Sequence, residues 1–170
     1  AITKDQIKQI ASEDRDSLDF ARVSDGLSDE IRLGITIDVA YKFFETKKKK
    51  FIIADCPGHL QYTRNMFTGA STANIAVLLI DVTKSVTEQT KRHLFIISLL
   101  RIPHLVICFN KMDLIDYDED KFMKLKSELF EIFKKLSITD VRFVPTSALN
   151  GDNITPKKTK MEWYKGADLL

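Results

Sequence analysis

The sequence predicts a three-layer α/β fold built around a mostly parallel sheet. Short apolar runs of strand length alternate with longer segments in which apolar residues recur at helical spacing, as is typical of such folds. The run 75–80 is apolar throughout, as in a strand that is buried on both faces. Polar residues follow several of the runs directly, and ligands bind at the carboxyl ends of strands in these sheets. We therefore expect a ligand site at that edge.

The first expected element is a helical segment over residues 1–24, in which apolar residues form only a weak stripe. A loop follows and ends at Gly34. Residues 35–44 and 51–54 are expected to form an antiparallel pair of strands. The basic run 47–50 lies between them and is interpreted as a solvated hairpin turn.

Helices and strands alternate over the rest of the chain. Helices are expected over 60–73, 87–100 and 118–136, and strands over 75–80, 105–109 and 141–144. In the last helix the apolar residues recur at helical spacing, and we interpret Met123 and the phenylalanines there as core residues. The whole chain, residues 1–170, is expected to form one domain.

The composition is ordinary for a soluble globular protein, with 44% hydrophobic residues and 29% charged residues. The net charge of +2 argues neither for nor against nucleic acid, the basic residues are scattered, and we expect no nucleic acid partner. No apolar stretch reaches the roughly 18 residues of a membrane helix, and no signal peptide is recognisable at the N-terminus. We therefore expect no membrane association.

The chain has two cysteines, Cys56 and Cys108, which fit a reducing cytoplasm and no disulfide framework. Cys108 lies in an apolar run and is expected to be buried. Cys56 and His59 could be imagined as zinc ligands, but no further ligand pair has suitable spacing, which argues against a zinc site.

The quartet Asn110-Lys111-Met112-Asp113 follows the apolar run 105–109 directly. The carboxylate of Asp113 would accept from both the ring N–H and the exocyclic amine of guanine, a donor pair that adenine lacks. A site built around such groups rejects a ligand that leaves them unpaired. Lys111 would lay its stem along the base, and Asn110 would tie neighbouring loops together. By itself the quartet is equally compatible with a polar loop after a strand.

A second motif, Asp55-Cys56-Pro57-Gly58-His59, follows the apolar run 51–54. Asp55 at the tip of the strand would hold a magnesium ion through water. Gly58 would offer its backbone N–H to a γ-phosphate, which needs close backbone approach and no side chain.

Two further elements complete the pattern. The backbone of Ser147-Ala148-Leu149, after the run 141–144, would contact the guanine carbonyl. The Thr36 hydroxyl would bind Mg²⁺ when a γ-phosphate is present and let go after hydrolysis. Four such elements in this order are hard to produce by chance, and together they indicate a GTP site with Mg²⁺.

With these motifs, the segments Ile37 to Tyr41, Gln61 to Met66 and Thr68 to Thr72 resemble the large, GTP-binding subunit of sulfate adenylyltransferase. That subunit is a branch of the translation-factor-type GTPases, so the resemblance implies a GTPase-like domain of the phosphate-loop class. It also implies that His59 orients the attacking water. The implied partner is a separate, small catalytic subunit that joins sulfate to the AMP part of ATP in the cytoplasm. GTP hydrolysis would drive this uphill step.

Such a GTPase needs the phosphate loop Gly-x-x-x-x-Gly-Lys-Ser/Thr, and no segment of the chain matches it. By the resemblance, the loop and the first strand would lie upstream of residue 1, and the missing strand would lie between the strands at 51–54 and 75–80. We expect a fragment that alone binds GTP weakly and hydrolyses it negligibly. Leu33, Cys56 and Leu60 depart from the resembled subunit in or beside the switches.

Two alternatives of other classes stay open at this point. One is a translation factor that delivers aminoacyl-tRNA, since elongation factors share the stretch Thr68 to Ser71 and the ending Trp163 to Gly166. The other is a non-catalytic docking module with a degraded GTPase fold, which the missing phosphate loop and the departures at Cys56 and Leu60 favour.

Overall fold

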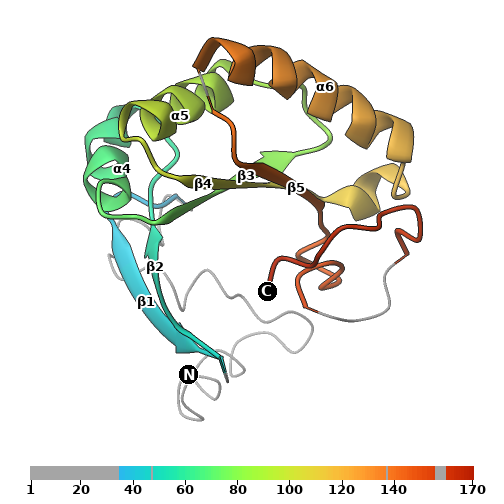
Figure 1. Cartoon of the computed structure of the whole chain (residues 1–170), viewed down its shortest axis with the longest axis horizontal. Coiled ribbons are helices and arrows are strands. Elements are labelled where there is room, and N and C mark those ends of the chain that lie inside the picture. Colours follow the sequence, from blue (N-terminus) through green and yellow to red (C-terminus); the bar gives the residue numbers. More distant parts are fainter. Residues whose placement is uncertain (1–34, 47, 137, 156–159) are drawn as a thin grey trace. The chain divides into compact units, whose positions relative to one another are not determined.

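A computed structural model describes residues 35–46, 48–136, 138–155 and 160–170 of the chain (Figure 1). The helical segment expected over residues 1–24 and the loop that precedes Gly34 lie outside these residues. The chain divides into two compact units, residues 1–72 and 73–170. The expectation of one domain over residues 1–170 stays a prediction.

In the first unit, strands β1 (Ala40–Glu45) and β2 (Lys50–Asp55) form the predicted antiparallel pair. Thr46 closes the turn: its N–H donates to the Lys49 carbonyl over 2.8 Å, and its hydroxyl oxygen accepts from the Lys49 N–H. The rings of Phe44 and Phe51 stack across the pair, 4.7 Å apart. The hairpin interpretation of the basic run is therefore confirmed for its described residues.

Strand β1 begins at residue 40, not at the predicted residue 35. The backbone before it has other partners, because the Asn65 side chain donates to the Ile37 carbonyl over 2.9 Å. The Asp38 carboxylate also accepts from the N–H of Val39. Residues 35–39 therefore make side-chain hydrogen bonds and lie outside the strand ladder.

The predicted helix over 60–73 is a short 3-10 turn, η1 (Leu60–Tyr62), followed by α4 (Thr63–Ala70). Gly69 is buried on α4. A Cβ atom there would lie 2.6 Å from the Cys56 sulfur and 2.9 Å from the Val39 side chain. Only glycine therefore lets this helix approach the segment after β2 so closely.

In the second unit, β3 (Ile75–Asp81), β4 (His104–Asn110) and β5 (Val141–Pro145) form a parallel sheet in the order β3-β4-β5. Helices α5 (Glu88–Leu99) and α6 (Glu119–Leu136) lie over the same face of this sheet (Figure 1). The strands, helices and parallel pairing follow the sequence prediction to within one residue at most ends. The α/β class and the parallel sheet are confirmed.

Helix α6 buries a stripe of four residues, Phe122, Leu125, Leu129 and Phe133, against the sheet. Met123 is 49% exposed and Phe130 is 45% exposed, so the interpretation of both as core residues is wrong. Each follows a stripe residue by one position, which turns its side chain about 100° away from the core.

Strand β3 is buried on one face only, contrary to the prediction from its continuous apolar run. Ile75, Val77 and Leu79 are 51%, 52% and 65% exposed, whereas Leu78 and Ile80 are buried. Among the described residues β3 pairs only with β4, and β2 only with β1.

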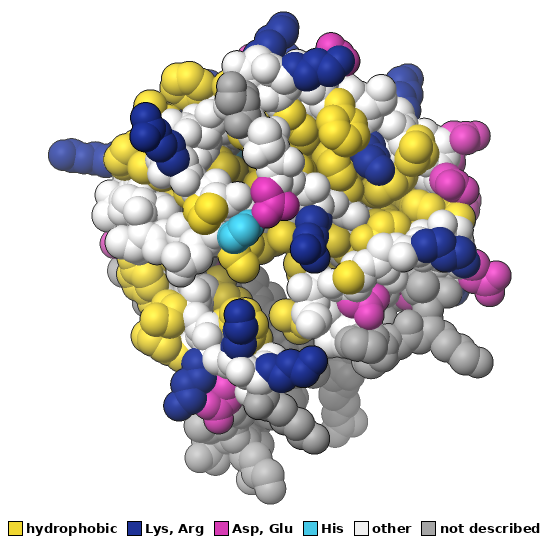
Figure 2. Space-filling model, in the orientation of Figure 1, with side chains coloured by type: hydrophobic (Ala, Val, Ile, Leu, Met, Phe, Trp, Pro, Cys, Tyr) yellow, Lys and Arg dark blue, Asp and Glu magenta, His cyan; other side chains and the backbone are white. Residues whose placement is uncertain are grey.

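The surface mixes charged and hydrophobic side chains. Figure 2 shows Lys and Arg side chains spread over the face in view, interspersed with Asp, Glu and apolar groups. Cys108 is buried as predicted, with 1% exposure. Within the described ranges, no helix is long and apolar enough to cross a membrane.

Candidate functional site

The carboxyl ends of β3, β4 and β5 meet at one edge of the parallel sheet. Backbone hydrogen bonds connect the segments that follow these strands. The Val82 N–H donates to the Asn110 carbonyl over 3.1 Å, and the Thr146 N–H donates to the Phe109 carbonyl over 2.8 Å. The Met112 N–H donates in turn to the Thr146 carbonyl over 3.1 Å. Three loops that are distant in sequence are therefore held side by side.

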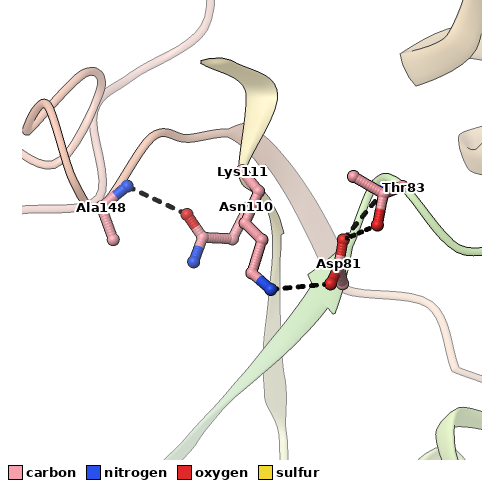
Figure 3. A network of polar contacts seen from close by, with 5 residues as sticks. All are labelled: Asp81, Thr83, Asn110, Lys111 and Ala148. Carbon is pink, nitrogen blue, oxygen red and sulfur yellow. Dashed lines mark hydrogen bonds and ion pairs between the residues drawn. The ribbon is translucent and has the colours of Figure 1, made fainter. Parts of the chain in front are cut away.

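Asn110 ties two of these loops through its side chain. Its Oδ1 atom accepts from the Ala148 N–H over 2.9 Å (Figure 3). The same atom accepts from the Thr146 hydroxyl over 3.5 Å. This is the tie between neighbouring loops that the sequence predicts for Asn110. The bond also fixes the backbone of the segment Ser147 to Leu149.

Asp113 is oriented by a buried hydroxyl. The Ser147 side chain, which is fully buried, donates to Asp113 Oδ1 over 2.6 Å. The Ser147 oxygen also accepts from the Asn150 N–H over 3.3 Å. The carboxylate is therefore held in one orientation at the edge of the sheet, half-buried and available to a ligand.

Lys111 has a left-handed backbone, with φ of 69°, and its ammonium reaches across to the end of β3. Its Nζ atom lies 2.8 Å from Asp81 Oδ2, and Asp81 Oδ1 accepts from the N–H and the hydroxyl of Thr83 over 2.9 and 2.6 Å (Figure 3). Burial raises the pKa of Asp81, but the bonds from Lys111 and Thr83 outweigh it and lower the pKa to about 2.

Met112 and Leu149 lie at opposite extremes of burial. Met112 is fully buried in the core beneath the loop, whereas Leu149 is 86% exposed. Met112 therefore anchors the quartet, and Leu149 is accessible to a ligand at the same edge.

Tyr117 makes hydrogen bonds that connect the loops around the site. Its hydroxyl donates to Asp152 Oδ2 over 3.1 Å and accepts from the Asn150 side-chain amide over 3.0 Å. Its carbonyl accepts from the Trp163 indole N–H over 3.0 Å. These bonds connect the loop after β4 with the loop after β5 and with the C-terminal segment.

Sequence reasoning missed Asp81, Thr83 and Tyr117. For Asp81 a signal was present, because it follows the apolar run 75–80 as Asn110 follows 105–109. Tyr117 carried no comparable signal, since its partners Asn150, Asp152 and Trp163 lie 33, 35 and 46 residues further along the chain.

The second motif lies in the first unit, after β2. Asp55 is the last residue of that strand and is half-buried, Pro57 is buried, and His59 is exposed. Burial raises the pKa of the Cys56 thiol, and the charge of Asp55 raises it further. Gly58 and Thr36 are half-buried. This motif and the quartet belong to different compact units of the chain.

No group of three or more His, Cys, Asp or Glu side chains that could hold a metal ion occurs in the part of the chain that the structure describes. This is compatible with Mg²⁺, which takes oxygen ligands and is held by one or two carboxylates together with substrate phosphates. The Asp55 carboxylate and the Thr36 hydroxyl are oxygen donors of this kind.

The family model of the elongation factor Tu GTP-binding domain matches residues 1–164 of the chain. The chain belongs to this family. It is 51% identical over 99% of its length to "Sulfate adenylyltransferase subunit 1" of Colwellia psychrerythraea. It is 54% identical over its full length to the protein of the same name in Shewanella woodyi. The chain spans 38% and 36% of these two relatives, a little over a third of their length.

The fold of this member of the elongation factor Tu GTP-binding domain family is also found among solved structures. The crystal structure of the GTPase-like domain of Ski7 from S. cerevisiae, bound to GDP and inorganic phosphate, matches it with a TM-score of 0.79. The match covers 98% of this chain and 42% of that one at 22% sequence identity. At this identity the similarity concerns the fold alone.

Proposed function

We propose that this chain is the GTP-binding part of a sulfate adenylyltransferase subunit. The proposal rests on the arrangement of the loops that follow β3, β4 and β5. There Asn110 ties the loops, and the Ser147 hydroxyl fixes the orientation of the Asp113 carboxylate. The similarity to sulfate adenylyltransferase subunit 1 at 51–54% identity supports this branch of the family over an elongation factor.

Guanine recognition would rest on the chemistry of Asp113. A carboxylate only accepts hydrogen bonds, and guanine offers two donors on adjacent positions of its ring. Lys111 would cover one face of the base with its stem. The exposed Leu149, on the loop held by Asn110, would contact the base together with the backbone of Ser147 and Ala148.

The phosphates would be contacted by the motif after β2. Gly58 would donate its backbone N–H to the γ-phosphate, while Asp55 and Thr36 would hold Mg²⁺, which neutralises phosphate charge when bound. His59, exposed and next to Gly58, would orient the attacking water. Cys56 and Pro57 shape the backbone between these groups.

In the complete enzyme, GTP hydrolysis would be coupled to the formation of adenosine 5′-phosphosulfate and diphosphate from ATP and sulfate. The adenylyl-transfer residues would lie on a small catalytic subunit. We propose a cytoplasmic heteromer of the two subunits, without nucleic acid or membrane.

The test is sulfate-dependent release of diphosphate from ATP by the full-length polypeptide together with its copurified partner. We expect GTP to raise the turnover, and His59→Ala to remove the GTP effect while leaving the basal rate of the partner unchanged. ATP without GTP and GTP without sulfate are the controls. No effect of GTP on diphosphate release would contradict the proposal and favour a docking module.

A further inference from the structure

Lys111 is anchored at the site edge by a carboxylate from another strand. Asp81 and Asn110 are partners in the parallel register of β3 and β4. Lys111 therefore lies one residue past the position that is paired with Asp81. The Nζ to Oδ2 distance is 2.8 Å. The Lys111 side chain is 52% exposed and that of Asp81 only 21%, so the anchor is the more enclosed of the two.

Asp81 is itself held in place. Its Oδ1 atom accepts from both the N–H and the hydroxyl of Thr83, at 2.9 and 2.6 Å, which leaves Oδ2 directed at Lys111 (Figure 3). The three bonds stabilise the ionised form of the carboxyl, which therefore stays charged at neutral pH. A lysine stem without such an anchor samples many rotamers, and ordering it on binding weakens affinity.

We propose that Asp81 is a positioning residue for nucleotide binding: it holds the Lys111 side chain along the site edge before the base arrives. This inference rests on the proposed guanine-nucleotide site. Lys111 contacts the face of the base in this arrangement, whereas Asp113 reads its donor groups. Loss of Asp81 therefore speeds nucleotide release and leaves the preference for guanine over adenine intact.

The experiment measures the release of a fluorescent GDP analogue from the full-length polypeptide by stopped flow. Asp81→Asn is expected to raise the release rate roughly threefold to tenfold, as for the loss of a partly exposed ion pair and of side-chain preorganisation. Asp81→Glu restores the charge and should recover part of the effect. Thr83→Val removes the hydroxyl hydrogen bond to Asp81 and should raise the release rate by a smaller factor. Asp116→Asn, a matched change at an exposed carboxylate on the same loop, is the control.

A double-mutant cycle with Lys111→Met separates positioning from general destabilisation. If Asp81 acts through Lys111, Asp81→Asn should add nothing to the release rate once Lys111→Met is present. Additive effects, or a release rate for Asp81→Asn equal to that of Asp116→Asn, would overturn the inference while the proposed function stands. Failure of the wild-type protein to bind the GDP analogue would overturn both.

Discussion

The chemistry of the site depends on a few side chains whose partners lie on other loops. Asp113 is oriented by Ser147, and Asn110 holds the backbone at Ala148, so neither residue depends on its own loop alone. In the proposed site the acceptor-only carboxylate of Asp113 would meet the two adjacent donors of guanine, so the identity of residue 113 would decide which base fits.

Asp113→Asn is therefore expected to exchange guanine for xanthine as the preferred base. The amide keeps one acceptor for the ring N–H and turns a donor toward position 2, where xanthine has a carbonyl and guanine has an amine. We expect GDP affinity to fall by about 100-fold and xanthosine diphosphate to be bound instead, since an unpaired polar group costs about 1–3 kcal/mol. Competition binding on the full-length polypeptide checks this.

Asp116→Asn again serves as the matched control for this exchange. It makes the same chemical change at an exposed position three residues away and should keep the guanine preference. An Asp113→Asn protein that still preferred GDP to the xanthosine nucleotide would show that Asp113 does not read the base.

At the scale of elements, the sheet of the second unit aligns the strand ends and helices α5 and α6 keep that sheet together. The Phe133 ring lies 6.0 Å from the Phe143 ring of β5, and the side chain is 3% exposed. On α5, Phe95 is 55% exposed. Burial, more than residue type, should therefore decide the effect of removing a phenyl ring.

Phe133→Ala is expected to destabilise the protein by about 3–5 kcal/mol, because it leaves a cavity between α6 and the sheet. Phe95→Ala, the matched control on the other helix, should change stability by less than about 1 kcal/mol. Thermal unfolding followed by circular dichroism on the full-length polypeptide compares the two. Equal losses would mean that the α6 stripe is not the core of this sheet.

At the scale of the whole molecule, the described chain contains two separate sheets and no phosphate-loop pattern. Both β2 and β3 have one strand partner among the described residues, and three apolar side chains of β3 face outward. Since the backbone donors of a phosphate loop supply much of the affinity for a nucleotide, base recognition alone gives weak binding.

These 170 residues by themselves are accordingly expected to bind GTP weakly and to hydrolyse it negligibly. Calorimetric titration with GTP and Mg²⁺ measures the dissociation constant, with a GTPase domain that contains a phosphate loop as the reference. A dissociation constant close to that of the reference domain would refute this expectation and would mean that the 170 residues hold the phosphates by other groups.

Much of the fold could be predicted from local pattern, because apolar runs and helical spacing are local properties. The strands over 105–109 and 141–144 and the helix over 118–136 were predicted almost to the residue. The exposed face of β3 could not be predicted, since an apolar run does not show whether anything covers it. Met123 was predicted to be buried because it is apolar, but its angular position on α6 turns its side chain away from the core.

The residue types of the candidate site and their order along the chain can be taken from the sequence alone: the quartet at Asn110, the motif at Asp55 and the loop at Ser147. The side chains that support them become known from the three-dimensional structure. Asp81 lies thirty residues before Lys111, and Ser147 lies 34 residues after Asp113. Their contacts exist because parallel pairing of β3, β4 and β5 brings the ends of distant strands to one edge, a long-range consequence that no local pattern contains.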